Sequence, residues 1–373
     1  MLKLLSLLSP LFINLFGAII LLATSNKNYK NRFYLGLFFA NSFIIFTGHF
    51  LSFLKYWELF KYIDFLFLSA LLAFYPLFYL FIKSAFNYNI LSPKNIYHFI
   101  PSIVVGILML ATTVYTGSKS YTIYMNNNLY NSPINNNGAL ILAFIYKGSR
   151  AFHLLQILFY NFITIKYIIA AKKNIHNSFS NLDKYQEKYF YIVTVSFILL
   201  MSIPGFFVTF IGRTPFISND IMLFLVTCIF TLLYIILAVI GIQQKPSESH
   251  FSDFEINDEL NHNNELLELE QHLIEYFNKE KPWLNPDLNI WDVAKNIGTN
   301  RSYVSKIINE NLGSNFNQFV NNYRIEEAKE LLKKSPERTI GEISELSGFG
   351  SVNSFIRIFK QTENCTPTKF KKS

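Results

Sequence analysis

Cysteine and charged residues are both scarce in this chain of 373 residues, which contains two cysteines and is 16% charged. Cys228 and Cys365 offer neither a disulfide framework nor the spacing of metal ligands, so we expect two inert thiols. The sequence also lacks an HExxH motif, a CxxC motif and a glycine-rich phosphate loop. With no catalytic arrangement in their place, we predict that the protein is not an enzyme and uses no cofactor.

The low charge is accompanied by long apolar stretches. Hydrophobic residues make up 51% of the sequence and aromatic residues 17%, and the mean hydropathy is +0.25. A helix needs roughly 20 apolar residues to cross the hydrocarbon core of a membrane. Seven stretches approach that length and predict seven transmembrane helices: residues 4–23, 33–54, 62–82, 96–116, 151–171, 189–211 and 221–242.

Three parts of this region depart from a simple row of spans. Residues 139–146 are apolar and precede the fifth stretch, where they would either extend that helix or lie on the surface. Residues 121–138 are polar and rich in asparagine, which predicts a flexible loop. The first stretch follows a single lysine, Lys3, and lacks a clear cleavage site, so we interpret it as a retained span and not as a signal peptide.

The last third of the chain has a different pattern, in which short amphipathic helices alternate with turns. Apolar side chains at helical spacing predict a support helix that packs through Ile340, Ile343 and Leu346. Gly348 ends this helix, and Ser351 is placed to cap the next one. The pattern predicts a helix-turn-helix unit.

The second helix of this unit, over residues 352–361, has two distinct faces. Aromatic side chains recur on one of them, which predicts that Phe355 and Phe359 are buried. The other face is polar and basic, as a helix in a major groove requires. Its residues are Asn353, Arg357 and Lys360.

The same layout recurs upstream with different residues. Residues 291–297 predict a support helix, residues 298–300 a turn and residues 301–311 a second recognition helix. Apolar residues over 316–332 recur every three or four positions, and Pro336 follows them. We therefore expect one long helix that joins the two units.

Residues 266–372 resemble the two-unit DNA-binding domain of the AraC/XylS family of bacterial transcription regulators. The resemblance is carried by LNPDLNIWDVAKNIG, by the linker NYRIEEAKELL and by GFGSVNSFIRIFK followed by a Thr-Pro pair. It implies a helical domain whose two recognition helices enter successive segments of the major groove on one face of double-stranded DNA.

The resemblance also implies roles for individual residues. Base edges would be contacted by Ser302, Lys306, Val352, Asn353 and Arg357. Phosphates would be contacted by Arg301 and Lys360. One position departs from the family, because Asn364 stands where glycine is usual. We expect Asn364 to adopt the positive φ of that turn, since asparagine tolerates this conformation.

An acidic segment joins the apolar and helix-turn-helix regions. Residues 244–264 have too few apolar side chains to pack, which predicts a solvated tether. The next residues, from Leu266 to Phe277, predict a helix, and we favour its packing onto the first unit over a dimer seam. The prediction is an all-α fold with a transmembrane domain (1–243), a tether (244–264) and a DNA-binding domain (265–373).

Seven spans place the two ends of the chain on opposite sides of a membrane. A DNA-binding carboxyl terminus must be cytoplasmic, so we expect the amino terminus outside. A small excess of lysine and arginine in the loops placed inside agrees with this orientation. The net charge of +8 is no argument for DNA binding, because the basic excess lies in residues 1–243. We predict a multi-pass protein of the cytoplasmic membrane.

Ionisable residues in or beside the spans are candidates for signal perception. Those predicted in the outer half are His49, Asp64, Arg150 and His153. They would line one outward-facing pocket in which Asp64 and Arg150 form an ion pair. In the alternative, which we favour, each residue lies at the wet end of its own helix.

These patterns predict a one-component transcription regulator whose transmembrane domain senses an unknown small molecule or membrane signal. Its expected partners are promoter DNA, membrane lipid, a second copy of the chain and RNA polymerase. In an alternative, the spans are a passive anchor or a partner-binding scaffold. Proteolysis in the tether would then release the DNA-binding domain.

Overall fold

The computed structural model of the chain divides into two compact units. The first comprises Met1–Ile168 and Ile192–Ser252, and the second comprises Ile169–Tyr191 and Asp253–Ser373. The regular structure of the described residues is helical, apart from one isolated β-bridge. This agrees with the predicted all-α class. The structure describes residues 1–26, 29–86, 93–130, 137–182, 202, 219–243 and 263–372.

Six described helices are long and apolar enough, by length and composition, to cross a membrane. They coincide with six of the seven predicted spans, and the remaining one, 189–211, lies outside the described residues apart from Ser202. In chain order the helices are α1 (Leu2–Ala23), α2 (Lys30–Phe53), α3 (Trp57–Phe86), α4 (Ile100–Tyr130), α5 (Asn137–His176) and α8 (Asp220–Gln243), with the short 3₁₀ helix η2 (Pro93–Phe99) before α4.

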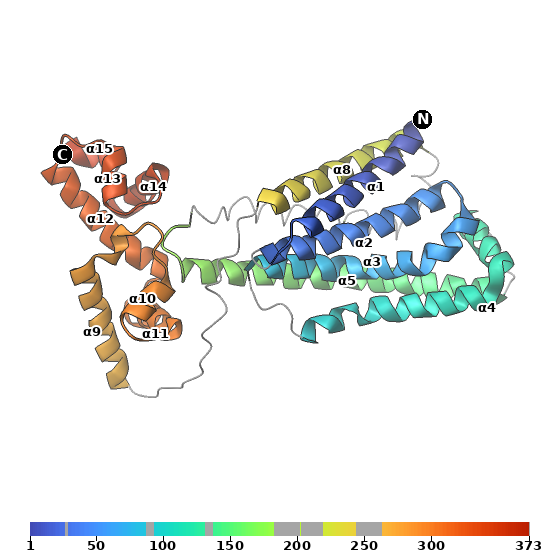
Figure 1. Cartoon of the computed structure of the whole chain (residues 1–373), viewed down its shortest axis with the longest axis horizontal. Coiled ribbons are helices and arrows are strands. Elements are labelled where there is room, and N and C mark those ends of the chain that lie inside the picture. Colours follow the sequence, from blue (N-terminus) through green and yellow to red (C-terminus); the bar gives the residue numbers. More distant parts are fainter. Residues whose placement is uncertain are drawn as a thin grey trace. The chain divides into compact units, whose positions relative to one another are not determined.

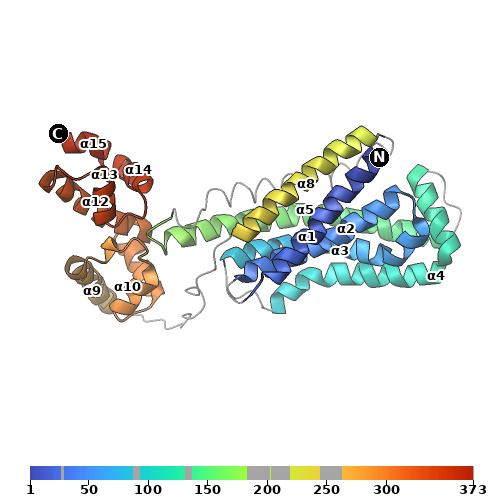
Figure 2. The ribbon, with the colours of Figure 1, turned by 45° about the horizontal axis from the view of Figure 1, so that its top comes forward.

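Within the first unit, neighbouring helices pack side by side. Helix α1 lies against α2 and α8, α2 lies against α3, and α3 lies against α4 (Figures 1 and 2). Helices α2 and α3 approach each other closely at Gly48 of α2, because a Cβ atom at this position would lie 2.2 Å from the ring of Phe67 on α3. Large apolar side chains also remain on the outside, with Val114 76% and Phe144 80% exposed.

Two segments of this unit bear on the sequence predictions: one prediction is wrong in part, and one open alternative is resolved. The predicted flexible loop is wrong for its first ten residues, because α4 continues through them beyond a kink at Gly117. Tyr121 and Tyr124 are buried there, since their spacing places both rings on one helical face. Residues 139–146 extend α5, which resolves the alternative that the sequence left open.

The second unit contains the shorter helices of the carboxyl-terminal region. They follow the predicted order of support helix, turn and recognition helix in two successive copies. The elements are α9 (Asn263–Glu280), η5 (Pro282–Leu284), α10 (Ile290–Asn296), α11 (Arg301–Lys306), η6 (Ile307–Asn311), α12 (Phe316–Lys334), α13 (Ile340–Leu346), α14 (Val352–Glu363) and α15 (Pro367–Lys372).

Each helix-turn-helix copy has its own apolar core, and α12 contributes to both. The first core includes Phe277 of α9 and Phe319 of α12, whose ring centroids are 4.8 Å apart. The second includes Ala328 of α12 with Phe355 and Phe359 of α14. This packing confirms the long joining helix and the placement of α9 on the first copy. The predicted tether, 244–264, lies almost entirely outside the described residues.

One residue of the predicted apolar face is not buried. Leu346 is 45% exposed, whereas Ile343, Ser344 and Ser347 of the same helix are buried. The reason is the helical period of 3.6 residues, because two steps of three residues, from Ile340 to Leu346, drift off the packed face, whereas the positions i+3, i+4 and i+7 stay on it. Small serine side chains therefore lie where α13 approaches its neighbours.

Candidate nucleic-acid interface

The first helix-turn-helix copy is held by two asparagine caps. Asn289 accepts hydrogen bonds from the backbone N–H groups at the start of α10, and Asn300 does so at the start of α11. Between them, Gly298 adopts a φ of 73°, which glycine reaches without steric cost. The buried Val304 then fixes the rotation of α11 and leaves Ser302 and Lys306 exposed.

The first recognition helix is not regular throughout. After Lys306 it continues as the π-helical turn η6, whose Ile307 and Ile308 are fully buried. Gly313 follows with a φ of 62°, and a capping box between Asn315 and Gln318 begins α12. The predicted helix over 301–311 is thus present, with a tight α-helical first half and a wider second half.

The turn of the second copy is more crowded than that of the first, where a Cβ atom on Gly298 would have no neighbour within 4 Å. Thr339 and Glu342 form a capping box at the start of α13. Gly348 then adopts a φ of 83°, and a Cβ atom at this position would lie 2.2 Å from the carbonyl oxygen of Trp283. Because both its φ and its surroundings exclude a side chain, Gly348 is required here. Ser351 accepts the N–H of Ser354 and caps α14, as its position in the sequence predicts.

Helix α14 presents the polar face that the sequence predicts. Phe355 and Phe359 are fully buried. The Nη2 atom of Arg357 donates to the Ser354 hydroxyl at 3.2 Å, while the side chain as a whole remains exposed. Asn364 ends the helix with a φ of 55°, so the predicted conformation is confirmed. The exposed residues of this face are Val352, Asn353, Arg357 and Lys360.

Arg301 differs from the other predicted DNA contacts, because it is half-buried. Its guanidinium lies over the Trp291 ring at 5.6 Å, and its Nη2 donates to the Ser178 hydroxyl at 3.0 Å. Burial lowers the pKa of Arg301 from its usual value, although an arginine remains charged at neutral pH. Six of the seven residues predicted to contact DNA are therefore exposed, whereas Arg301 is half-buried and bound to Ser178.

Arg324 is a buried charge that the sequence argument overlooked. It is 1% exposed, and it donates hydrogen bonds of 2.8 Å to the carbonyl oxygens of Trp283 and Asn285. Burial lowers its pKa to about 10, against the opposing effect of the Asp287 carboxylate. The sequence did indicate this burial, because Arg324 lies four residues from both Val320 and Ala328 and shares one helical face with them.

The four candidate signal residues of the first unit have different neighbours. Asp64 is fully buried, and its carboxylate accepts hydrogen bonds from the hydroxyls of Tyr121 and Tyr146 rather than from the predicted partner Arg150. The ring of His49 lies 5.3 Å from that of Phe67, and the ring of His153 lies 5.5 Å from that of Tyr75. These contacts do not decide between one shared pocket and the favoured alternative, in which each residue lies at the end of its own helix, and both stay predictions.

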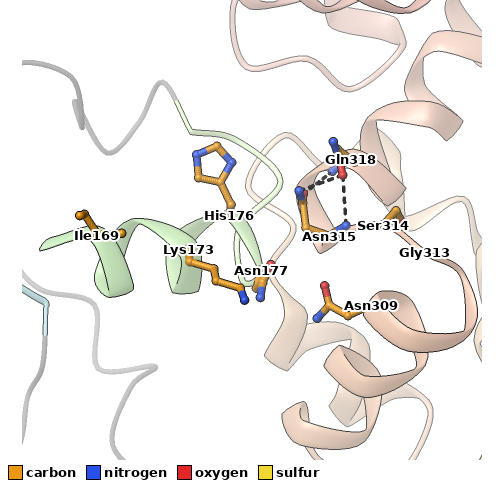
Figure 3. Close-up of a pocket in the computed structure, with 9 residues that line it drawn as sticks. All are labelled: Ile169, Lys173, His176, Asn177, Asn309, Gly313, Ser314, Asn315 and Gln318. Atoms are coloured by element: carbon orange, nitrogen blue, oxygen red, sulfur yellow. Dashed lines mark hydrogen bonds between the residues drawn. The ribbon is translucent and has the colours of Figure 1, made fainter. Parts of the chain in front are cut away.

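A surface depression of about 470 Å³ occurs within the second unit. Lys173, His176 and Asn177 line one side of it, and Asn309 and Gln318 lie opposite (Figure 3). Gln318 is already engaged in the capping box with Asn315. No cluster of metal ligands occurs among the described residues.

Comparison with known families decides the nature of the carboxyl-terminal region. Residues 293–373 match a model described as a helix-turn-helix domain. The region is an AraC-type helix-turn-helix domain. An uncharacterized HTH-type transcriptional regulator of Staphylococcus aureus is 38% identical over 85 residues, which span 23% of this chain and 11% of that protein.

Two further relatives are also named as regulators. An uncharacterized HTH-type regulator in the cgkA 5' region of Pseudoalteromonas carrageenovora is 39% identical over 88 residues, 23% of this chain and 51% of that protein. The regulatory protein PocR of Salmonella typhimurium is 34% identical over 24% of this chain and 29% of its own length. Each match thus covers about a quarter of this chain and about half or less of the relative's own length.

A solved structure also matches this domain. It is the C-terminal domain of the two-component response regulator yesN from Fusobacterium nucleatum, with 28% identity and a TM-score of 0.25. The match covers 29% of this chain and 98% of that one.

Proposed function

We propose that the protein is a membrane-embedded transcription regulator of the AraC type, in which apolar helices perceive a signal and the carboxyl-terminal domain binds specific DNA sites. One observation carries the proposal. A single chain combines an AraC-type domain, whose recognition helices present exposed polar residues, with six helices long and apolar enough to cross a membrane.

The membrane location is supported by the outer faces of the long helices. Side chains such as Phe144 on α5, Val114 on α4 and Leu232 on α8 are more than half exposed. Exposure of such extensive apolar surfaces to water would be unfavourable, whereas their contact with lipid would not be. In the proposed topology the amino terminus is outside, residues 189–211 form a seventh span, and the AraC-type domain is in the cytoplasm.

The DNA-binding role is supported by the fixed positions of the two recognition helices on α12. We assign base contacts to Ser302, Lys306, Val352, Asn353 and Arg357, and phosphate contacts to Arg301 and Lys360. A second copy of the chain and RNA polymerase are the proposed protein partners, since paired sites and a transcriptional output require them.

Chromatin immunoprecipitation of the tagged full-length protein tests this function. A Lys306→Ala/Arg357→Ala variant should lose discrete promoter peaks, because each recognition helix loses the exposed cation assigned to a base edge. Lys279→Ala is the control, since Lys279 is an exposed lysine on α9 outside both helix-turn-helix copies. Promoter peaks that persist unchanged in the double variant would contradict the assigned interface.

Fractionation of the same cells separates signalling in place from proteolytic release. Full-length protein in the membrane fraction, together with promoter peaks, supports the proposal. A soluble fragment that begins near Asn263 and alone occupies promoters would instead favour release of the domain by cleavage.

A further inference from the structure

A short segment of the second unit binds the AraC-type domain from a distant place in the sequence. The segment comprises residues 177–182 and directly follows α5, and its Ser178 lies 123 positions before its partner Arg301. Since the domain match begins at residue 293, this segment is an addition to the AraC-type domain and not part of it.

The backbone of the segment pairs with the chain just before α10. The N–H of Ser180 donates to the Leu288 carbonyl at 3.2 Å, and the N–H of Ile290 donates to the Ser178 carbonyl at 2.9 Å. These two bonds flank an antiparallel bridge between Phe179 and Asn289. Backbone pairing of this kind fixes the register of the segment, because a shift by one residue would break both bonds.

Side chains hold the segment more firmly than the backbone alone would. Ser178, Phe179 and Ser180 are 0%, 3% and 2% exposed. The Phe179 ring lies 5.6 Å from that of Trp291. Two buried side chains of α12 serve the same segment, because Asn317 donates to the Ser180 carbonyl at 2.7 Å and Arg324 donates to the Ser180 hydroxyl at 3.0 Å.

The docked segment engages a residue predicted to contact DNA. The guanidinium of Arg301, the first residue of α11, donates to the Ser178 hydroxyl, and its Nε has no hydrogen-bond partner. A hydrogen bond from arginine to a neutral hydroxyl is weaker than one to a phosphate. The contacts of Phe179 and Ser180, more than that of Arg301, must therefore keep the segment in place.

The segment also reaches the second helix-turn-helix copy. A Cβ atom on Gly350 would lie 2.0 Å from the amide nitrogen of Asn181. Gly350 immediately precedes Ser351, which caps α14. The six residues 177–182 thus contact the amino-terminal ends of both recognition helices and also α12, which joins the two copies.

We propose that residues 177–182 are a docking segment through which α5 controls DNA binding, and that the docked segment holds Arg301 away from the DNA phosphates. The inference rests on the proposed function. Helix α5 is continuous from Asn137 to His176, so displacement of its end acts directly on the segment. Release of the segment frees Arg301 and adds one phosphate contact.

A disulfide that locks the segment in place tests the proposal. Phe179 and Asn289 face each other between the two backbone bonds, where Cα atoms of an antiparallel pair are about 4.5 Å apart, which suits a disulfide. Phe179→Cys and Asn289→Cys are combined in a full-length Cys228→Ser/Cys365→Ala protein. The purified protein in detergent is oxidised, and its binding to a fluorescent DNA duplex of mixed sequence is measured across salt concentrations.

The locked protein should bind this duplex more weakly than the reduced protein, and reduction should restore binding. One phosphate contact changes the slope of log K against log salt by about 0.9, so the affinity difference should grow about 3.5-fold between 200 and 50 mM salt. Single-cysteine variants are the controls. Failure to form the disulfide would overturn the docking, and equal affinities and slopes of the two forms would overturn the control of DNA binding.

Phe179→Ala provides an independent test, because it weakens docking without touching a recognition helix. This variant should bind the duplex more tightly and with a steeper salt dependence, and a further Arg301→Ala change should remove that gain. Asn177→Ala, at the edge of the segment, is the matched control. Unchanged or weaker binding of Phe179→Ala would contradict the proposal. If no form binds DNA at any salt, the proposed function itself fails, while the yield of disulfide still reports on docking.

Discussion

The two helix-turn-helix copies differ in how completely each presents its recognition helix. Helix α14 has 12 residues and displays Asn353, Arg357 and Lys360 to solvent. Helix α11 has 6 residues before it widens into a π-turn, and its first residue, Arg301, is turned toward Ser178. The side chains predicted to contact DNA are thus all exposed in the second copy, whereas one of those in the first copy is bound to another segment of the chain.

The difference suits the two copies to different roles, the second to base recognition and the first to regulation. A preformed, exposed face binds DNA without prior rearrangement, so the second copy is suited to base recognition. The first copy has a residue whose availability depends on another segment of the chain, so it is suited to regulation. Both copies share α12, and a change that acts on this helix should affect them together.

The largest expected effect follows from removal of Arg324, whose guanidinium donates to Trp283 of the first core and lies over the Phe349 ring of the second core at 5.8 Å. Arg324→Met would leave the buried Trp283 carbonyl oxygen without its donor and would remove the hydrogen bonds to the Ser180 hydroxyl and to the Asn285 carbonyl, which still accepts the N–H of Leu288. An unsatisfied buried group costs about 1 to 3 kcal/mol and each lost hydrogen bond about 1 kcal/mol, so the domain should lose about 3 kcal/mol or more of unfolding free energy. Thermal unfolding of the full-length protein measures this loss.

Two variants sharpen the Arg324 test. Arg324→Lys retains the charge but not the planar set of donors, and should recover only part of the stability. Lys334→Ala changes an exposed lysine on the same helix and should lie within about 0.5 kcal/mol of the parent. A loss as small for Arg324→Met as for Lys334→Ala would show that Arg324 does not join the two copies.

A second prediction ranks the copies by their contribution to DNA specificity. Arg357→Ala should cost about 1 to 3 kcal/mol of binding to a promoter fragment recovered by immunoprecipitation, because a paired arginine contact to a base edge is lost. Lys306→Ala should cost less, since lysine makes no bidentate contact. Competition against mixed-sequence DNA measures the change in discrimination. An Arg357→Ala protein that discriminates as well as the parent would reject base contact by this residue.

Local pattern predicted most of the AraC-type domain, because caps, glycine turns and apolar spacing act over a few residues. Ser351, Gly348 and Asn364 all behave as their positions predict. The contacts of residues 177–182 could not be predicted in this way, since they depend on a fold that joins residues 108 or more positions apart in the chain. The burial of Tyr121 and Tyr124 was missed for a related reason, because an asparagine-rich composition concealed two aromatics on one helical face.

A smaller effect is expected at the end of α14. The turns of the first copy place glycines, Gly298 and Gly313, at positive φ, whereas the second recognition helix ends at Asn364 with a φ of 55°. Asn364→Gly should therefore stabilise the protein slightly, and Asn364→Ala should destabilise it by about 1 kcal/mol, because a non-glycine residue without a short polar side chain is strained there. Unfolding midpoints in denaturant compare the three proteins. A more stable Asn364→Ala variant would contradict the strain.

The smallest predicted effect concerns pH and the caps of the two support helices. Helix α10 is capped by the uncharged Asn289, whereas α13 uses Glu342, which accepts hydrogen bonds from the N–H and hydroxyl of Thr339 at 2.7 and 2.9 Å. These bonds lower the pKa of Glu342 below its usual value of 4.5 in the folded state. A carboxylate with a lowered folded pKa stabilises the fold fully above its unfolded pKa and loses that contribution as the pH falls through its folded pKa. Unfolding midpoints of the parent and Glu342→Gln should therefore differ near neutral pH and converge in acid. A difference that stays constant with pH would show that the carboxylate charge plays no part in the cap.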